Sequence, residues 1–344
     1  MMHKIKQWID ISEDFQDGAL ILGNGASIAI DSNFDYLSIL EYATKEKLLN
    51  SDVKLLFEKY ETKDFELILR MVWTAFEVNK AFKIEDIKTK NAYENVRDAL
   101  IKSVRDIHPT YSSVEEILPD LYRFLRHFKF TFSLNYDLLV YWACMYGNNV
   151  DTEYSFKDCF NGSEFTQNWR KYLPIYKRKK SRLVFFPHGS LILGKTITEE
   201  EYKISAKNSE HNLLDNILDI WTEGKCIPLF VSEGMAKQKI KSILNSGYLS
   251  IVYRETLKEA CEKVTIYGWG VSEQDIHILD AMKTPKNIIK TKFAVSVRKN
   301  NQAYCTKVKG ILEEKFPNCE VTFFDSESPG CWNNSFESHK RASS

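Results

Sequence analysis

The sequence predicts an α/β protein with an open, mostly parallel sheet and helices on both faces. Two features lead to this fold class. Short runs of consecutive apolar residues alternate with segments whose apolar residues recur every three or four positions. Turn formers are also scarce, because 14 Gly and 8 Pro among 344 residues are about half of the usual share of roughly 12%. A chain this poor in turn formers is not expected to form an all-β sandwich.

The expected strands are continuous apolar runs, which suit a parallel sheet that is buried on both faces. The first comprises residues 19–22 and ends at Gly23, and the second comprises residues 128–134 and ends at Asn135. The other runs are residues 183–186, 227–231, 264–267, 293–297 and 321–324. Ligands of such sheets bind at the carboxyl ends of the strands, so the residues that follow these runs are the candidates for a site.

Helices are expected between the later strands, at residues 236–244, 248–261, 273–282 and 303–316. This alternation makes the expected sheet Rossmann-like. The long interval between the first two strands predicts a helical insertion at about residues 38–105, with helices at 38–49, 64–80 and 93–107. Residues 146–181 are expected to form a loop with a short helix, and a polar tail is expected after about residue 330. Residues 1–344 are interpreted as a single domain.

Charge and cysteine content exclude several classes of protein. Lys+Arg and Asp+Glu both number 47, which argues against a nucleic-acid-binding surface spread over the protein. The basic run at residues 176–182 is interpreted as a solvated loop, because no aromatic platform accompanies it. No apolar run reaches about 18 residues, so no membrane span is expected. The seven cysteines contain no CxxC pair, so no zinc module or other metal site is predicted. Their odd number, without a secretory signal, predicts free thiols in the cytoplasm.

The first candidate motif is a glycine-containing loop that follows the first strand. It reads Gly23-Asn24-Gly25-Ala26-Ser27, and glycines at such a turn let the backbone approach a phosphate. The dinucleotide fingerprint needs a third glycine where this chain has Ile28, and there is no GxxxxGK[ST] loop. The alternative interpretation is a plain strand-to-helix turn.

The second and third motifs follow the next two strands. Asn135 and Asp137 could orient a water or a ribose hydroxyl and stabilise positive charge, or they could simply cap a helix. His188, followed by Gly189, stands where a general base would act, although a single histidine can also be structural.

The fourth motif is the segment from Gly268 to Asp275. Gly268, Gly270 and Ser272 suit a contact with ribose or adenosine. The alternative is a helix start, because Ser272 and Asp275 fit the [ST]-x-x-[DE] signal.

The order of the four motifs resembles the sirtuin-like NAD-binding domain, in which a GAGxS loop, a TQNxD segment, an HG dipeptide and a GTS-type loop follow one another. The sequence is similar to zinc-free bacterial members, including a group with a segment like residues 228–234. The resemblance implies that Asn135, Asp137 and His188 are catalytic, with His188 as the base. It also implies a set of NAD-binding residues: Gly23, Asn24, Gly25, Ala26, Ser27, Gly189, Gly268, Gly270 and Ser272.

The resemblance implies an NAD-cleaving enzyme, with NAD as a substrate and not as a bound cofactor. Zinc-free relatives are antiphage defence effectors, so we expect that role, a homo-oligomer and a partner protein of the defence system. A non-catalytic module that binds NAD or ADP-ribose is the alternative. A protein deacylase or ADP-ribosyltransferase is disfavoured for two reasons. The CxxC pairs that hold zinc in sirtuin deacylases are absent between His188 and Gly268, and the DFR-like segment at residues 33–36 lacks its arginine.

Overall fold

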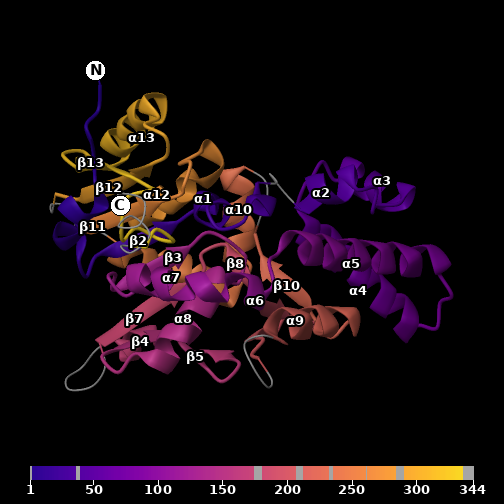
Figure 1. Ribbon diagram of the computed structural model, residues 1–344. Helices are drawn as coiled ribbons and strands as arrows, with labels where there is room; N and C mark the ends of the chain where they lie inside the picture. Colours follow the sequence, from indigo (N-terminus) through magenta and orange to yellow (C-terminus); the bar gives the residue numbers. More distant parts are fainter. Residues whose placement is uncertain are drawn as a thin grey trace.

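A computed structural model describes residues 2–35, 39–173, 180–206, 212–231, 235–260, 262–283 and 290–335. Its centre is an open sheet of eight strands, all parallel to their neighbours (Figure 1). The α/β fold predicted from the sequence is therefore confirmed. The strands of this sheet are β1 (Ile5–Lys6), β2 (Ala19–Leu22), β3 (Phe130–Ser133), β4 (Tyr154–Lys157), β7 (Lys180–Phe185), β11 (Lys263–Tyr267), β12 (Lys292–Val297) and β13 (Glu320–Asp325).

The strand order identifies the place where a ligand would bind. Across the sheet it is β1-β13-β12-β11-β2-β3-β7-β4. The chain passes from β2 outward through β3 to β7 and then returns to β11 on the other side of β2. Numbered along the chain, the six inner strands have the order 3-2-1-4-5-6 of the Rossmann fold. The direction of winding reverses between β2 and β11, and the crevice at such a reversal is the usual binding site.

One expected strand belongs to a different sheet. Residues 227–231 contain β10 (Ile227–Phe230), but it pairs antiparallel with β8 (Gly189–Lys195), which in turn pairs with β9 (Glu201–Lys203). Assigning this run to the parallel sheet was wrong, because an apolar run predicts a buried strand but not its partner or direction. The prediction of a loop at residues 146–181 was also wrong in part. This segment contains β4 at the sheet edge and a hairpin of β5 (Phe160–Asn161) and β6 (Glu164–Phe165).

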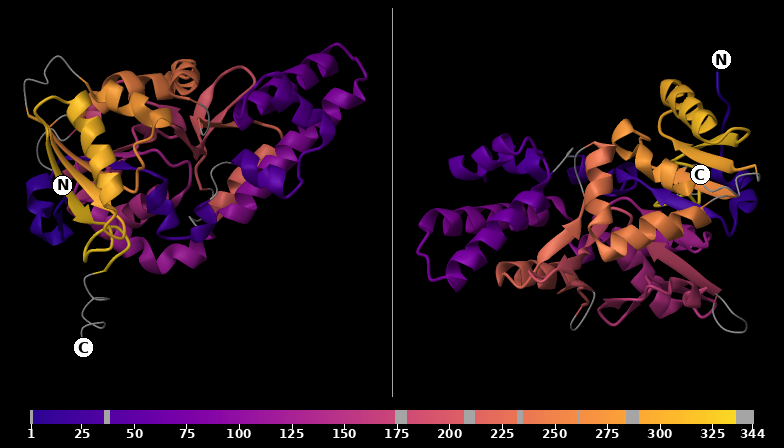
Figure 2. Two further views of the ribbon diagram at one scale, coloured as in Figure 1. Left: turned by 90° about the horizontal axis from the view of Figure 1, so that it is seen from above. Right: turned by 180° about the vertical axis from the view of Figure 1, so that it is seen from behind.

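Helices cover both faces of the parallel sheet, with α7 and α8 on one side and α12 and α13 on the other (Figures 1 and 2). The segment expected as one helix at 248–261 is divided into an α-helix, a π-turn (Val252–Thr256) and a 3-10 turn (Leu257–Glu259). Other 3-10 turns lie at Trp8–Asp10, Ser12–Phe15, Ser32–Phe34, Glu115–Ile117, Trp169–Tyr172 and Glu273–Asp275. The helices outside the insertion are α1 (Asn24–Ile28), α6 (Tyr111–Val114), α7 (Leu118–Leu125), α8 (Leu139–Val150), α9 (Leu213–Thr222), α10 (Ala236–Leu244), α11 (Gly247–Ile251), α12 (Ile276–Met282) and α13 (Gln302–Lys315).

The predicted helical insertion forms an arm that projects from the sheet (Figures 1 and 2). Side-chain caps explain where its helices begin: Asn50 accepts a hydrogen bond from the Val53 amide, and Asp64 accepts one from the Leu67 amide, both at 2.9 Å. At its base, α4 packs against β10 and α5 packs against α9. The arm helices are α2 (Ile39–Lys45), α3 (Ser51–Lys59), α4 (Phe65–Ala81) and α5 (Ile87–Ile107).

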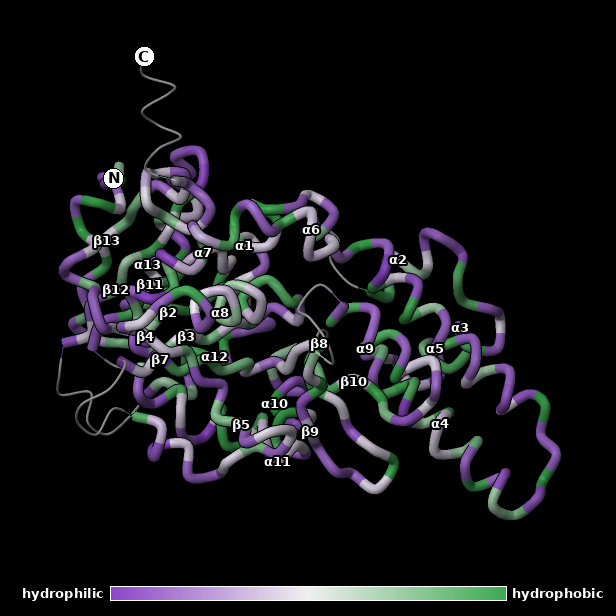
Figure 3. Tube along the Cα trace, turned by 60° about the horizontal axis from the view of Figure 1, so that its bottom comes forward, coloured by the Kyte–Doolittle hydropathy of each residue, from purple (hydrophilic) through white to green (hydrophobic). Residues whose placement is uncertain are grey.

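The arm exposes apolar side chains towards its outer end, among them Leu55, Val78, Phe82, Ile84 and Ile87. Figure 3 shows the hydrophobic segments along the arm. No helix in the described ranges is both long and apolar enough to span a membrane.

The C-terminal segment closes over the first loop of the sheet. Cys331 and Trp332 are buried, and the Trp332 indole donates a hydrogen bond to the Ala26 carbonyl at 2.8 Å. The packed fold therefore continues past residue 330, where we expected a polar tail. Residues 336–344 lie outside the described part of the chain, as do residues 176–179 of the basic run and residues 232–234.

A buried carboxyl group lies where the arm meets the second sheet. Glu66 on α4 is only 9% exposed. Burial raises its pKa to about 8, and the neighbouring Asp64 carboxylate adds to this, whereas Arg70, Lys195 and the Phe230 amide oppose it. The folded chain therefore holds a neutral carboxyl group at a pH where the unfolded chain ionises it.

We predict that Glu66 lowers stability as pH rises. A carboxyl group whose pKa is higher in the folded chain than in the unfolded chain stabilises the fold. This stabilisation is complete below the unfolded pKa near 4.5, and it is lost as the pH rises to about 8. Glu66→Gln should therefore gain at least about 1 kcal/mol of unfolding free energy relative to wild type between pH 5 and pH 9. Urea titrations at several pH values measure this difference. Glu58→Gln, at an exposed position of α3, is the control, and a difference for Glu66→Gln that stays constant with pH would contradict the prediction.

Candidate functional site

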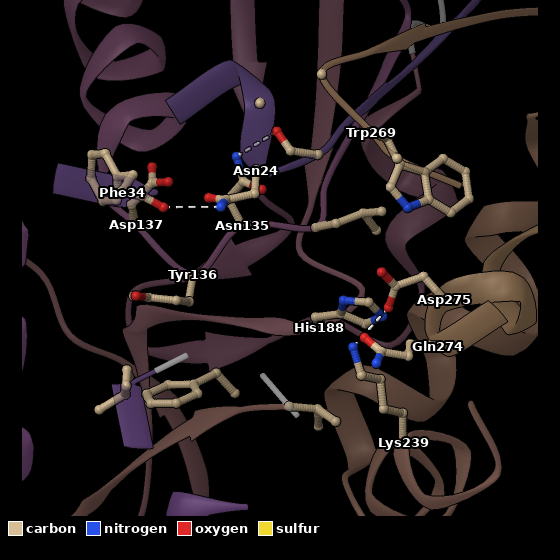
Figure 4. A pocket seen from close by; sticks show the side chains of 18 residues that line it. Asn24, Phe34, Asn135, Tyr136, Asp137, His188, Lys239, Trp269, Gln274 and Asp275 are labelled. Atoms are coloured by element: carbon tan, nitrogen blue, oxygen red, sulfur yellow. Dashed lines mark hydrogen bonds and ion pairs between the residues drawn. The ribbon is translucent and has the colours of Figure 1, made fainter. Parts of the chain in front are cut away.

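The carboxyl ends of β11, β2, β3 and β7 meet at one pocket of about 310 Å³ (Figure 4). Each of these neighbouring strands is followed by one of the four sequence motifs. The structure thus brings together motifs that lie up to 245 residues apart, between Gly23 and Gly268. Eight residues singled out from the sequence line the pocket: Gly23, Asn24, Gly25, Asn135, Asp137, His188, Gly268 and Gly270.

Four other residues from the motifs do not line it. Ala26 and Ser27 are buried beneath the first loop. Gly189 lies on β8, where a side chain would meet the carbonyl oxygen of Leu229 at 2.1 Å. Ser272 stands before the 3-10 turn Glu273–Asp275, and its side chain makes no capping hydrogen bond there.

The glycines hold the first and fourth loops against each other. The Gly25 amide donates a hydrogen bond to the Gly268 carbonyl at 2.7 Å. A Cβ on Gly23 would lie 2.5 Å from the Cα of Trp269, and a Cβ on Gly268 would lie 2.3 Å from the Ala26 nitrogen. Gly268 also has a φ of +66°, which favours glycine. The glycines therefore permit close packing of the two loops. The Gly25 N–H already donates its hydrogen bond within this packing.

A buried hydroxyl links the first loop to the residues after β3. Ser27 donates a hydrogen bond from Oγ to the Asp137 carboxylate and accepts one from Asn135 Nδ2 at 2.8 Å. The same amide nitrogen of Asn135 lies 3.1 Å from the Gly23 carbonyl oxygen. These bonds orient the Asn135 side chain at the pocket wall. Ser27 is thus a positioning residue under the pocket.

Asp137 combines the two roles that the sequence left open. Its Oδ1 accepts a hydrogen bond from the Leu139 amide at 2.9 Å, at the start of α8, and the residue also lines the pocket. It is 3% exposed. Burial raises the pKa of this carboxyl group, although the hydrogen bonds from Ser27 and Leu139 oppose the shift.

His188 lies in a buried polar cluster on the opposite side of the pocket. Its Nε2 is 2.9 Å from Nε2 of His277, and Lys239 Nζ donates a hydrogen bond to Asp275 Oδ1 at 2.7 Å. Burial lowers the pKa of His188 to about 3, and Lys239 lowers it further while Asp275 opposes this. Burial also lowers the pKa of His277 to about 4. Both rings are therefore neutral at pH 7.

Sequence reasoning missed three members of this cluster. Asp275 stands in the fourth motif, but we interpreted it as part of a ribose or adenosine contact or as a helix signal, and not as a neighbour of His188. His277 comes two residues later and Lys239 lies on α10, and neither belongs to a motif. Their convergence depends on how α10 and α12 pack together, so only the position of Asp275 after the strand gave a signal.

Trp269 brings an unused hydrogen-bond donor to the pocket. It lines the cavity (Figure 4), and its buried indole N–H has no partner among the described residues. Two side chains from α13 hold the loop: Tyr304 donates to the Trp269 carbonyl at 2.6 Å, and Lys307 to the Gly270 carbonyl at 3.3 Å. A buried donor at a pocket wall is costly unless a ligand or water accepts its hydrogen.

Comparison with known proteins places this chain in a family. The family model described as "Domain of unknown function (DUF4917)" matches residues 20–332. The chain belongs to the DUF4917 family. The matched range contains all of β2 except its first residue, the strands from β3 to β13, the arm and all pocket residues of this DUF4917 protein. No curated protein matches the chain.

We predict that the two loops tolerate a methyl group at one glycine and not at another. Gly25→Ala would place a Cβ 2.7 Å from the Gly268 carbonyl oxygen, so it should lower the unfolding free energy by about 1–3 kcal/mol. Gly270→Ala is the matched control, because nothing lies within 4 Å of its Cβ and stability should change by less than about 1 kcal/mol. Denaturant unfolding measures both variants. Equal stability of the two would refute the packing role of Gly25.

Proposed function

We propose that this DUF4917 protein cleaves the bond between nicotinamide and ribose in NAD. The observation that carries the proposal is the convergence of Asn135, Asp137 and His188 on one pocket at the winding reversal of a Rossmann-ordered sheet. Dinucleotides bind at this point of such sheets. The motifs that contain these residues follow the order of the sirtuin-like NAD-binding domain, and the fold is compatible with that resemblance.

The pocket offers suitable surroundings for one end of a dinucleotide. Its volume of about 310 Å³ is at the lower end of the range of small-molecule sites. NAD would therefore extend from it towards the open side. Gly270, which is uncrowded, leaves space for the adenosine half. The free indole N–H of Trp269 can donate to a ligand oxygen.

The reaction requires little acid catalysis. The C1′–N1 bond breaks with its electron pair moving to the nicotinamide nitrogen, so the cationic ring leaves as a neutral base. Positive charge develops on the ribose, as in glycoside hydrolysis. The Asp137 carboxylate and the Asn135 side-chain oxygen supply negative electrostatic potential beside that charge. A water oxygen then bonds to C1′ and gives ADP-ribose.

The proton of that water passes to His188 in this proposal. A ring with a pKa of about 3 is a weak base. It is nevertheless sufficient, because a water that has bonded to an oxocarbenium carbon is strongly acidic. The neutral ring first accepts a hydrogen bond and so orients the water, and it takes the proton only after the C–O bond forms.

A binding module for NAD or ADP-ribose is the second candidate. The His188–His277 contact favours it, because Nε2 of His188 is already engaged at 2.9 Å. A ring held in this way can line a pocket without moving a proton. Release of nicotinamide distinguishes the enzyme from the binding module.

An effector role in antiphage defence belongs to the proposal through the resemblance. A homo-oligomer and a partner protein of the defence system follow from the same resemblance. The exposed apolar side chains towards the outer end of the arm, such as Phe82 and Ile87, are the surface that we propose for these contacts. Such surface patches are typical of protein interfaces.

We predict that wild-type protein releases nicotinamide from NAD. His188→Ala and Asn135→Ala should each reduce the rate by at least about 100-fold, because each removes a group that orients water or ribose. Chromatographic measurement of nicotinamide and ADP-ribose tests this, with circular dichroism to confirm folding.

His3→Ala is the control, because it removes an imidazole outside the pocket, next to Phe323. It should cleave NAD at the wild-type rate. If wild type binds NAD but releases no nicotinamide, the binding module is the better description. If wild type cleaves NAD and both pocket variants do so equally well, the residue assignment fails.

A further inference from the structure

Three potential metal ligands meet at the wall of the pocket. They are His188, Asp275 and His277, and one ligand atom from each lies within 4.8 Å of the other two. His188 follows β7, whereas Asp275 and His277 lie at the start of α12. The two histidines are 6% and 1% exposed. The cluster is therefore assembled by the fold and is held in place by packing.

The contact between the two rings brings two potential nitrogen ligands side by side. Nε2 of His188 and Nε2 of His277 lie 2.9 Å apart, and a hydrogen on one of them can satisfy this contact. Nδ1 of His277 is buried and has no hydrogen-bond partner among the described residues, so the hydrogen of this ring can move to it. Both Nε2 atoms would then be free to bind one ion beside them.

We propose that His188, Asp275 and His277 bind a divalent first-row transition-metal ion. Two imidazoles and one carboxylate are a common ligand set for such ions. Nitrogen atoms 2.9 Å apart subtend about 90° at an ion that is ~2.1 Å from each. This angle suits neighbouring ligands in an octahedral site. The remaining positions would face the pocket and hold water.

Lys239 opposes the ion. Its ammonium group lies 2.7 Å from Asp275 Oδ1 and balances the charge of that carboxylate. A divalent ion at Asp275 must displace this group or share the carboxylate with it. Replacing Lys239 by an uncharged side chain of similar length should therefore strengthen metal binding, which a merely structural cluster would not show.

The metal site shares His188 with the proposed site of NAD cleavage. When Nε2 of His188 is bound to an ion, it cannot accept a proton. Under the proposed function, a bound metal would therefore suppress nicotinamide release. Direct metal binding tests the site whether or not the protein cleaves NAD.

The experiment uses Co²⁺ as the probe, with the full-length protein treated with chelator and then titrated. One equivalent should bind and give visible d–d absorption of nitrogen and oxygen ligands, without a sulfur charge-transfer band. Isothermal titration with Zn²⁺ gives the stoichiometry independently. His277→Gln and Asp275→Asn, which preserve side-chain size, should each weaken binding by at least about 10-fold.

Two further variants complete the test. Lys239→Met should bind Co²⁺ several-fold more tightly, and His3→Ala, which removes an imidazole outside the pocket, should bind as wild type does. Failure of wild type to bind one equivalent would overturn the proposal. Unchanged affinity in both folded variants, His277→Gln and Asp275→Asn, would overturn it as well.

Discussion

The contact between the loops after β2 and β11 determines the geometry of the whole site. These strands are neighbours at the winding reversal, and their loops must pass each other at backbone distance. The hydrogen bond from Gly25 to Gly268 joins them. Because a side chain at Gly23 or Gly268 would overlap the opposing backbone, glycine is required on both sides. The loops thus form one wall, from which Trp269 and Asn24 line the pocket.

The pocket separates two polar networks. On one side, Ser27 connects Asn135 with the buried carboxyl group of Asp137. On the other side, His188 and His277 are neutral rings. A ligand that develops positive charge would be stabilised beside the carboxylate. A metal ion would bind on the histidine side.

Local patterns predicted much of the fold. The runs that became β2, β11, β12 and β13 are mostly apolar, and helix α10 has the predicted bounds. The run at 227–231 was assigned to the wrong sheet, because apolar character specifies burial and not pairing. β4 was missed because it lies at the sheet edge, where only Phe156 of its four residues is buried.

The four sequence motifs similarly predicted where the pocket lies. They could not predict that Gly25 bonds Gly268, or that Lys239 from another helix meets Asp275, because such contacts depend on packing between distant elements.

The central claim is that this pocket binds NAD through its nicotinamide ribose. A crystal structure of the His188→Ala variant with NAD tests it most directly, because that variant should hold uncleaved substrate. The account predicts the nicotinamide ribose beside Asn135 and Asp137, with a ligand oxygen accepting the hydrogen bond of the Trp269 indole. NAD bound elsewhere on the protein, or a pocket that stays empty at saturating NAD, would contradict it.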